Sequence, residues 1–411
     1  MFVRAAPGRS FRIGAMLPLS GVRVVEFGQV AAGPFCGMLL ADMGADVIKV
    51  ESREGDGLRQ WPPHTRNPSA PDEPGFSENF ASVNRNKRSV VLDLRDPGGL
   101  EAGRRLALSA DVLLENFRPG VLPRLGLGYD ALAKEKPSLV YCSISAFGQT
   151  GPRAEEGGFD LTVQAIGGVM SVTGEPGGRP VKCGVPLSDF SAGLYAAFAI
   201  VSALRKAQRE GVGQHIDVAM LGATLGIAAL QTSEFFGTGR DPMKLGSAHP
   251  RNAPYQAFRA KDGYFAMAAG NDKLWLAVCA ALDRPDLAAD ARFASTALRA
   301  KHQEALRDLL EAAFADRLVA DLLALFSARG VPCAPINAYS QVLADPQVED
   351  MGWVRPLELA NGARTLTFIS PLRMSRETFG VYRRPPALGE HTAEVLAELG
   401  LAPPGPPKPS A

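Results

Sequence analysis

The 411-residue sequence predicts an α/β fold, with a parallel sheet covered by helices in a large domain and a smaller α+β domain. Short β-branched runs alternate with helical segments up to residue 145, which is typical of a parallel sheet. The sequence then changes character near residue 250, where a hairpin signal precedes several helical segments. The first observation predicts the large domain, and the second predicts the small one.

The predicted strands of the large domain begin with the run VRVVEF at 22–27. The later strands are predicted at 46–51, 89–94, 111–116 and 139–145. Helical segments lie between them: FCGMLLADMG closed by Gly44, 98–108 and 129–134. Ligands of parallel sheets bind beyond the carboxyl ends of the strands, near the point where the strand order reverses. The loops expected to bind a ligand are therefore 28–34, 116–120 and 146–160.

Residues 190–232 predict a helix of small residues, a turn, a strand, and a second helix from about 219. Small residues allow close helix packing, so a contact between domains or subunits is expected in this region. The following segment predicts a hairpin turning at Lys261–Gly263. Helices are then predicted at 272–282, 300–314 and 318–328. A linker at 330–337, the strand-like RTLTFIS and a final helix at 391–399 return the chain to the large domain.

The predicted organisation follows from these segments. It comprises a disordered extension at 1–16, a large domain at 17–230, a small domain at 231–329, a linker and return at 330–402, and a disordered tail at 403–411. The extension carries three arginines and no acid, which leaves a mitochondrial targeting segment as an alternative. The tail, PPGPPKPSA, is too rich in proline to pack.

Composition and charge exclude several classes of protein. The formal net charge is +1, with 46% hydrophobic and 21% charged residues, so nothing global favours nucleic acid or a membrane surface. We expect no membrane-spanning segment, because we find no apolar run of about 18 residues. Five scattered cysteines indicate reduced thiols in a cytoplasmic protein. The five histidines lie far apart in the sequence, so no metal site is predicted.

Familiar catalytic motifs are missing, and one aspartate stands out. The sequence contains no GxxxxGK[ST] loop, no GxGxxG after the first strand, no HExxH and no GxSxG. Asp189, in GVPLSDFSAG, immediately precedes the helix of small residues. From the local pattern alone, Asp189 fits a helix N-cap that accepts a backbone N–H group. It also fits a catalytic carboxylate, and the local pattern leaves both interpretations open.

Segments from about Leu17 to Leu399 resemble the class III CoA-transferase family, which includes formyl-CoA transferase, carnitine CoA-transferase and α-methylacyl-CoA racemase. The matching segments, in order, are VVEFGQVAAGPFCGMLLADMGADVIKVE, NRNKRSVVLDL, DVLLENFRPG, SISAFGQTGP, GFDLTVQAIGGVMSVTG, LSDFSAGLYAA, GVGQHIDVAM and PALGEHT. The resemblance implies a Rossmann-like large domain built from both ends of the chain. It also implies an interlocked, ring-like homodimer.

The resemblance implies that Asp189 is the nucleophile of a CoA transfer between carboxylic acids, with an aspartyl anhydride and an aspartyl-CoA thioester as intermediates. Acyl-CoA and a carboxylic acid would be substrates, and no permanently bound cofactor or metal is expected. The family's CoA-binding positions match the loop after the first strand and the ENFRPGVLPRLG segment of this sequence, namely Val30, Ala31, Ala32, Gly33, Asn116, Phe117 and Arg124. Lys87 and Arg88, in NRNKRS, are candidates for binding the phosphates of CoA.

The residue at position 159 distinguishes transfer from racemisation within this family. The racemase members carry a histidine there, which exchanges the α-proton of the substrate. The side chain of Phe159 cannot accept or donate a proton, so transfer is favoured. Stretches such as KLGSAHPRNAPYQAF look most like succinyl-CoA-dependent dicarboxylate CoA-transferases of the succinate–hydroxymethylglutarate type. The free carboxylate of such a substrate would need a partner, and the candidates are Arg59, His249 and Arg251.

Three alternatives to this function remain at the level of sequence. The chain could be a racemase-like acyl-CoA enzyme despite Phe159. It could be a CoA-binding protein without catalytic activity, although the retained Asp189 argues against this. A nicotinamide-dependent dehydrogenase is indicated only by the alternation of strands and helices, and the missing glycine fingerprint counts against it.

Overall fold

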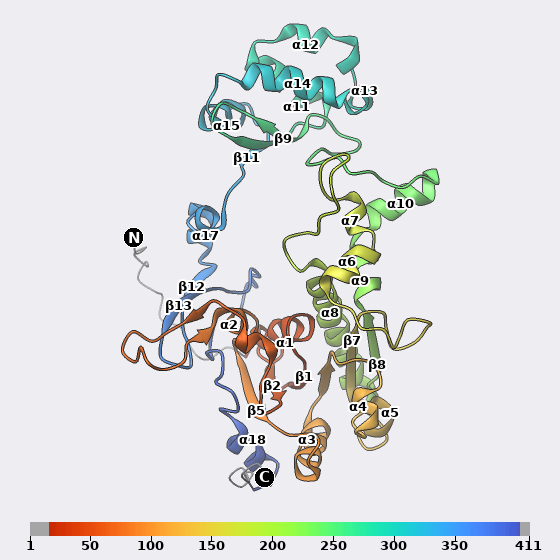
Figure 1. Cartoon of the computed structure of the whole chain (residues 1–411), viewed down its shortest axis with the longest axis vertical. Helices are drawn as coiled ribbons and strands as arrows, with labels where there is room; N and C mark the ends of the chain where they lie inside the picture. The colour runs from red at the N-terminus through yellow and green to blue at the C-terminus, as the bar shows by residue number, and fades with distance from the viewer. Residues whose placement is uncertain (1–15, 403–411) are drawn as a thin grey trace. The chain divides into compact units, whose positions relative to one another are not determined.

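The computed structural model describes residues 16–402 of the chain (Figure 1). The predicted tail at 403–411 and the predicted extension, apart from Met16, lie outside the described residues. The described chain forms two compact units. The first contains the residues up to 167, 184–229 and those from 350 onward, and the second contains 168–183 and 230–349.

The boundaries of the second unit differ in two places from the predicted small domain. The chain enters this unit at 230, one residue before the predicted start, but leaves it at 350 rather than 330. The residues that were expected to form a linker contain a strand, Cys333–Pro335, which pairs with a strand of the second unit. The segment 168–183 also belongs to this unit, where the Gly174 carbonyl accepts the N–H of Gly246.

The first unit is built on a six-stranded parallel sheet with the order β5-β2-β1-β6-β7-β8. Its strands are β1 (Arg23–Phe27), β2 (Asp46–Glu51), β5 (Lys87–Val91), β6 (Val112–Glu115), β7 (Val140–Ser145) and β8 (His215–Ala219). Strand β5 begins two residues before its predicted start. Numbered among the parallel strands alone, the order is 3-2-1-4-5-6, that of a dinucleotide-binding fold. The order therefore reverses between β1 and β6.

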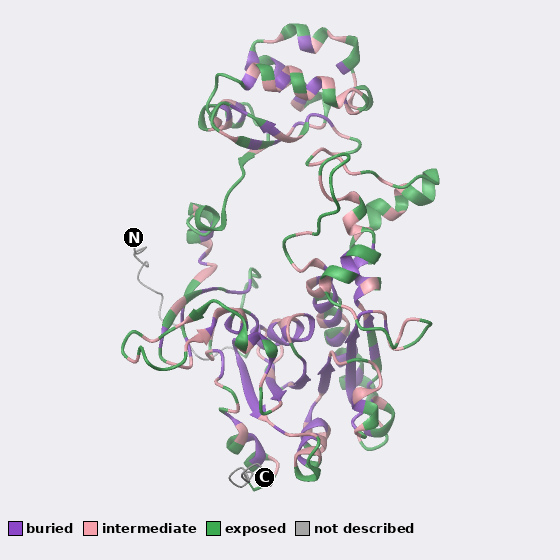
Figure 2. Cartoon of the chain, viewed as in Figure 1, coloured by how far each residue is buried: buried purple, intermediate pink, exposed green. Residues whose placement is uncertain are grey.

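Both faces of this sheet are covered. Along β1, Val24 belongs to the apolar core on one face and Val25 to the core on the other, and both are fully buried. Figure 2 shows the central strands buried along their lengths. Consecutive residues of a strand point to opposite faces, so a strand covered on both sides needs apolar residues at successive positions. This explains the run VRVVEF.

Helices of the first unit supply these two cores. Helices α1, α8 and α9 pack on one face, whereas α3, α4, α5 and α18 pack on the other. The helices of this unit are α1 (Ala32–Asp42), α2 (Glu78–Asn84), α3 (Pro97–Ser109), α4 (Val121–Arg124), α5 (Tyr129–Leu132), α6 (Asp160–Ile166), α8 (Leu187–Glu210), α9 (Met220–Ile227), α18 (Thr392–Glu398) and the 3-10 helix η1 (Gly57–Gln60).

Local sequence sets the ends of the longer helices. At the start of α3, the Asp96 carboxylate accepts the N–H groups of Gly98 and Gly99, and Pro97 occupies the first turn. Helix α8 ends at Gly211, whose φ of 72° lies in the left-handed region that glycine adopts readily. Capping residues thus define the start of α3 and the end of α8.

Helix α8 is, among residues 16–402, the one helix long and apolar enough to cross a membrane by length and composition. This corrects the expectation that no segment passes that test; its charged residues lie near its two ends. Ala192, Ala196 and Ile200 are fully buried in the core of the first unit. In this structure α8 therefore serves as a core helix.

Two short hairpins and the returning C-terminal chain complete the first unit. The hairpins are β3 (His64–Thr65) with β4 (Phe76–Ser77), and β12 (Val354–Glu358) with β13 (Arg364–Phe368). Helix α18 reaches the sheet at β5, where Thr392 Oγ1 accepts the N–H of Val91. The last segment of the chain thus closes the edge of the sheet, as expected of a large domain built from both ends of the chain.

The second unit combines a three-stranded antiparallel sheet, β11-β10-β9, with helices around its own apolar core. The predicted hairpin is formed by β9 and β10, and the predicted helix at 300–314 is broken at His302 into two. The elements are α7 (Val169–Val172), α10 (Ala229–Thr238), β9 (Tyr255–Arg259), β10 (Tyr264–Ala268), α11 (Asp272–Leu282), α12 (Pro285–Ala289), η2 (Ala291–Phe293), α13 (Thr296–Lys301), α14 (Gln303–Phe314), α15 (Val319–Ser327), β11 (Cys333–Pro335), α16 (Tyr339–Val342) and α17 (Pro346–Met351), which crosses the boundary at 350.

Candidate active site

Asp189 lies in the first turn of α8, two residues after the helix begins at Leu187. The N-cap position is Pro186, so Asp189 is not the N-cap that its local pattern allowed. Among the described residues, no hydrogen bond or ion pair engages its carboxylate. The neighbouring Phe190 stacks on Phe35 of α1 at 4.4 Å between ring centroids. This packing fixes the turn that carries Asp189 against α1 and leaves the carboxylate unpaired.

Burial and a neighbouring charge perturb this carboxylate. Asp189 is half-buried, and burial, followed by the charge of Asp160, raises its pKa to about 7 from the ordinary value of 3.8. A carboxylate that loses hydration without gaining hydrogen-bond donors is disfavoured in its charged form. Such a group is more basic and more nucleophilic than an exposed aspartate, and strongly perturbed titratable groups cluster at functional sites.

Asp160 organises the start of α8 from the neighbouring helix α6. Its Oδ1 accepts the N–H of Ser188 at 2.9 Å, and its Oδ2 accepts from Gln164 at 2.7 Å. Asp160 thus performs the capping that Asp189 could have performed, which frees the carboxylate of Asp189. The sequence analysis missed this role, although Asp160 directly follows the Phe159 used to weigh racemisation.

The loop between β1 and α1 lies at the reversal of strand order and is tied to the loop after β6. The Asn116 side chain pairs with both backbone groups of Gln29: its Oδ1 accepts the N–H at 2.8 Å, and its Nδ2 donates to the carbonyl at 2.9 Å. A Cβ atom on Gly33 would lie 3.1 Å from Asn116, so glycine allows this close approach. Two of the predicted ligand loops therefore meet at the carboxyl edge of the sheet.

A cavity of about 310 Å³ opens at this edge of the sheet. Its lining, which is partly apolar and partly polar, comes from the ends of β1 and β2 and from the loops that follow β1, β2, β5 and β6. The lining residues are Phe27, Gln29, Val50, Glu51, Ser52, Glu54, Leu92, Asp93, Leu94, Arg95 and Phe117. Ligands of such sheets bind in this position.

Comparison with known proteins identifies the family. The model of CoA-transferase family III matches residues 19–392. The chain belongs to CoA-transferase family III. It is 42% identical over 384 residues to a succinate–glutarate CoA-transferase of Agrobacterium fabrum, covering 93% of this chain and 96% of that protein.

Other relatives show the same breadth of similarity. The chain is 37% identical over 388 residues to a succinyl-CoA:mesaconate CoA-transferase of Haloarcula hispanica, covering 93% of this chain and 96% of that one. The crystal structure of a CAIB/BAIF family protein from Brucella suis superposes with a TM-score of 0.83 at 41% identity, covering 94% and 100% of the two chains. The resemblance drawn from the sequence is confirmed, and this protein is a family III CoA-transferase.

Two cations predicted to contact CoA are buried in ion pairs of this transferase. The side chain of Lys87 is completely buried, and its Nζ lies 2.8 Å from both a Glu26 carboxylate oxygen and the Pro34 carbonyl. Arg88 is 5% exposed and pairs with carboxylates of β2 and α18. Neither has a free donor for a phosphate, so the geometry does not support the phosphate-binding role predicted for Lys87 and Arg88.

Two exposed arginines could still bind the phosphates of CoA: Arg124, which the sequence predicted, and Arg95, which it did not. Arg124, at the end of α4, is exposed and has no ion pair among the described residues. Arg95 lines the cavity at the strand ends; its side chain is 80% exposed and, within residues 16–402, pairs with Asp93 alone, two residues away. The sequence analysis missed Arg95, although it directly follows the strand-like VVLDL run.

The three candidate partners for a substrate carboxylate lie in different units. Arg59, in the first unit, is held by Glu51 in two hydrogen bonds of 2.7 Å and lies over the Phe80 ring. His249 and Arg251 lie together in the second unit, where His249 Nδ1 accepts the N–H of Arg251 at 3.1 Å. The guanidinium of Arg251 is half-exposed and pairs with Glu234.

The guanidinium of Arg59 is thus occupied by contacts within the fold, whereas that of Arg251 keeps N–H donors exposed to solvent. His249 is also fixed, because its Nδ1 accepts from a second N–H group, that of Asn252. Burial, together with the charge of Arg251, lowers the pKa of His249, which favours its neutral form. A neutral imidazole that accepts at Nδ1 carries its proton on Nε2 and can donate from there.

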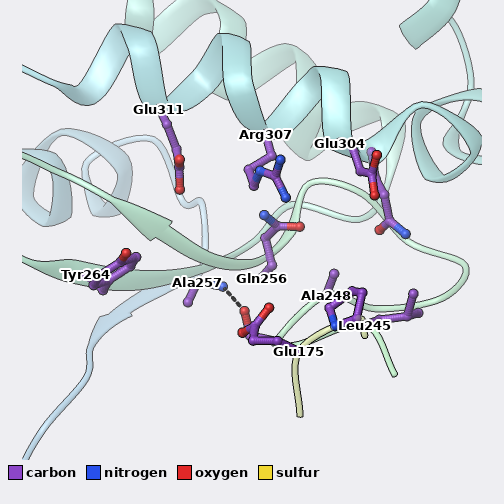
Figure 3. Close-up of a pocket in the computed structure, with 12 residues that line it drawn as sticks. Glu175, Leu245, Ala248, Gln256, Ala257, Tyr264, Glu304, Arg307 and Glu311 are labelled. Atoms are coloured by element: carbon purple, nitrogen blue, oxygen red, sulfur yellow. Dashed lines mark hydrogen bonds between the residues drawn. The ribbon is translucent and has the colours of Figure 1, made fainter. Parts of the chain in front are cut away.

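The second unit contains a larger cavity, of about 500 Å³, which none of the predicted site residues lines. Figure 3 shows Glu304, Arg307 and Glu311 extending from α14 toward Gln256 and Glu175 on the opposite side. Within residues 16–402, no group of three or more His, Cys, Asp or Glu side chains could hold a metal ion.

Proposed function

We propose that this transferase moves CoA from succinyl-CoA to a second dicarboxylic acid through covalent intermediates on Asp189. The observation that carries the proposal is the half-buried, unpaired carboxylate of Asp189 at the start of α8. The substrate class is supported by relatives of similar length whose names specify succinate or succinyl-CoA together with glutarate, mesaconate or citramalate.

The first half of the reaction loads the enzyme. A carboxylate oxygen of Asp189 attacks the thioester carbonyl of succinyl-CoA, the C–S bond breaks, and CoA leaves as a thiolate. The product is a mixed anhydride between succinate and Asp189. The thiolate then attacks the aspartyl carbonyl and releases succinate, which leaves CoA bound to Asp189 as a thioester.

The second half reverses these bonds on the acceptor. The acceptor carboxylate attacks the aspartyl thioester, expels the thiolate and forms a second anhydride. The thiolate attacks the acyl carbonyl of the acceptor, and the Asp189 carboxylate leaves. Each step exchanges one oxygen or sulfur nucleophile for another, so no proton has to be transferred. Because water would hydrolyse the anhydrides, the site must exclude it during turnover.

Backbone N–H groups at the start of α1 fit the oxyanions of these steps. The N–H groups of Ala31 and Ala32 have no acceptor among the described residues. Helix α1 packs on the turn that carries Asp189, through Phe35 and Phe190. Donors placed at a developing oxyanion contribute on the order of a hundredfold or more to turnover.

For CoA itself, the cavity at the strand ends offers apolar surface beside Phe117 and an exposed cation at Arg95. Arg124 supplies a second exposed guanidinium after β6. Arginine forks suit phosphate groups. Val30, Ala31 and Ala32 are proposed to lie beside the thioester end of CoA, whereas Asn116 acts by holding the backbone of Gln29.

Arg251 and His249 are our candidates for the free carboxylate of a dicarboxylate substrate. Arg251 offers exposed guanidinium donors, and His249 offers an N–H that is kept neutral by its surroundings. A panel of dicarboxylic and monocarboxylic acceptors tests this directly. Exchange with monocarboxylates alone would remove the dicarboxylate from the proposal and leave the covalent route intact.

A homodimer is supported by an exposed apolar face on α8. Leu194, Tyr195, Phe198 and Val201 are between 43% and 74% exposed on this helix. A continuous apolar face of this kind is typical of a protein–protein contact. Light scattering on the purified protein should give the mass of two chains, and the Phe198→Asp variant should shift the mass toward one chain.

A further inference from the structure

We infer that the buried ion pair of Lys49 and Asp56 is a positioning device, which holds the backbone of Val30 and thereby orients the free N–H groups of Ala31 and Ala32. The inference rests on the proposed function, because those N–H groups are the donors proposed for the oxyanions of CoA transfer. Neither Lys49 nor Asp56 touches the reacting atoms in this account.

Side chains hold three consecutive residues of the loop after β1 by their backbone groups. Lys49 Nζ donates to the Gly28 carbonyl at 2.6 Å. Asn116 engages both backbone groups of Gln29, as described above. The Asp56 carboxylate accepts the N–H of Val30, with its two oxygens at 3.1 and 3.2 Å. The loop therefore has little freedom before α1 begins.

Val30 needs such support because its backbone is unfavourable for its residue type. Its φ is 64°, in the left-handed region, where a β-branched side chain crowds the backbone. Strained residues persist only where surrounding contacts over-determine them, and they cluster at functional sites. A glycine would adopt this conformation without help. With valine at this position, the conformation depends on the hydrogen bond from the Val30 N–H to Asp56.

The ion pair itself is rigid and charged. Both side chains are completely buried, with Lys49 Nζ at 2.9 Å from Asp56 Oδ2 and 3.0 Å from Glu26 Oε1. Burial alone would lower the pKa of Lys49, but the carboxylates of Glu26, Asp56 and Glu51 raise it above its ordinary value. Burial would raise the pKa of Asp56, whereas Lys49 and the N–H groups of Leu58 and Val30 lower it. Both groups are therefore charged at neutral pH.

This arrangement connects the ion pair to the reaction. Helix α1 starts at Ala32, two residues after Val30, and its first turn packs against α8 beside Asp189. A rotation of the Val30 peptide would turn the N–H of Ala31 away from its present direction. A misplacement of about 1 Å at a catalytic group can cost on the order of a hundredfold in rate.

The test replaces Asp56 with asparagine and compares it with an equally buried aspartate outside the site. Asp42, at the end of α1, is 2% exposed and accepts from Arg85 and Asn86. Asp56→Asn should lower kcat for succinyl-CoA exchange by about 10- to 100-fold while KM changes less than about threefold. Asp42→Asn should lower Tm to a similar extent and leave kcat within about twofold.

A rescue variant separates positioning from general destabilisation. In the Asp56→Asn background, Val30→Gly should restore about tenfold of the lost kcat, because glycine adopts the positive φ unaided. If Asp56 acted only through stability, the added glycine would lower kcat or leave it unchanged. Equal losses of kcat in the Asp42 and Asp56 variants, with no rescue, would overturn the inference.

Amide hydrogen exchange tests the positioning role of Asp56 without an enzyme assay. Asp56→Asn should speed exchange of the Val30 amide at least about tenfold, whereas Asp42→Asn should leave it unchanged. Unchanged protection of this amide in Asp56→Asn would overturn the positioning role, even if the wild type transfers CoA. Loss of protection in Asp56→Asn, combined with a wild type that forms no adduct on Asp189, would instead support the positioning of Val30 and sink the proposed function.

Discussion

Asp56 and Asp189 are two aspartates of the same unit that the fold treats in opposite ways. Asp56 is completely buried, pairs with Lys49 and accepts the N–H groups of Val30 and Leu58. Asp189 is half-buried, and no hydrogen bond or ion pair in the described chain engages its carboxylate. The pKa of Asp56 is lowered, because Lys49 and the N–H donors outweigh its burial, whereas the pKa of Asp189 is raised to about 7.

The difference lies in donors rather than in burial. A buried carboxylate whose lone pairs are filled by donors is a fixed anion and serves as scaffold. One that has lost water without gaining donors keeps its lone pairs free and its basicity high, as a nucleophile requires. In this protein the capping of α8 by Asp160 makes that second state possible.

The largest expected effect comes from removing the nucleophile. Asp189→Asn should lower CoA exchange by about four orders of magnitude or more, because the neighbouring carboxylate, Asp160, has both oxygens engaged by Ser188 and Gln164. Steady-state exchange between succinyl-CoA and glutarate measures this. Exchange within about tenfold of wild type would contradict the covalent role of Asp189.

The two aspartates should respond to neutralisation with opposite changes in the free energy of unfolding. Asp56→Asn should lower it by about 2–4 kcal/mol, since Lys49 stays buried and loses a partner. Asp189→Asn should raise it at pH 8 by about 1–2 kcal/mol, a value discounted for partial exposure. Urea unfolding of both variants measures these changes in the free energy of unfolding. Changes of the same sign would contradict the contrast between the two aspartates.

The sign for Asp189 follows from its raised pKa. The folded protein binds more protons than the unfolded chain between the ordinary value of 3.8 and about 7. This group's contribution to stability is therefore present at low pH and is lost as pH rises through that window. The advantage of Asp189→Asn should shrink toward pH 4.

The pH profile of the reaction provides a third comparison. Because only the ionised form of Asp189 attacks, kcat/KM should rise with pH through a midpoint of about 7. At pH 6 the rate should be about a tenth of its plateau. Burial also raises the pKa of Glu115 to about 7, so the Glu115→Gln variant is the control and should keep the same midpoint. A flat profile between pH 5.5 and 8.5 would contradict the raised pKa of the nucleophile.

The contrast between paired and free groups extends to the arginines. Removing an exposed arginine at the cavity should have the smallest effect on the reaction. Arg95→Ala should raise KM for succinyl-CoA by about three- to tenfold with little change in kcat, because its exposed guanidinium is proposed to bind phosphate. Arg105, whose side chain is 49% exposed on α3 and pairs with Glu101, is the control outside the cavity. Arg105→Ala should leave KM unchanged.

Much of the fold could be predicted from the sequence, because a strand that is buried on both faces has apolar residues at consecutive positions. The strand at 46–51 and the helix at 272–282 match β2 and α11 residue for residue. The misplaced boundary at 330 has a physical cause: Cys333–Pro335 is too short to read as a strand, and only its pairing with β10 makes it one.

The candidate site was less predictable, because residue type does not reveal pairing. Lys87 and Arg95 look alike in sequence, yet one is buried against Glu26 and the other is exposed at the cavity. Likewise, nothing local distinguishes Asp56 from Asp189. Their roles depend on which donors the fold brings to them from distant strands and helices.

The most direct test of the covalent account is the mass of the intact protein after incubation with succinyl-CoA and hydroxylamine. Hydroxylamine converts an activated aspartyl group into a hydroxamate, and peptide mapping locates the change. The account predicts a hydroxamate on Asp189 in the wild type and none in Asp189→Ala, together with loss of exchange in that variant. An unmodified Asp189 with several acyl-CoA donors, and exchange that persists in Asp189→Ala, would contradict it.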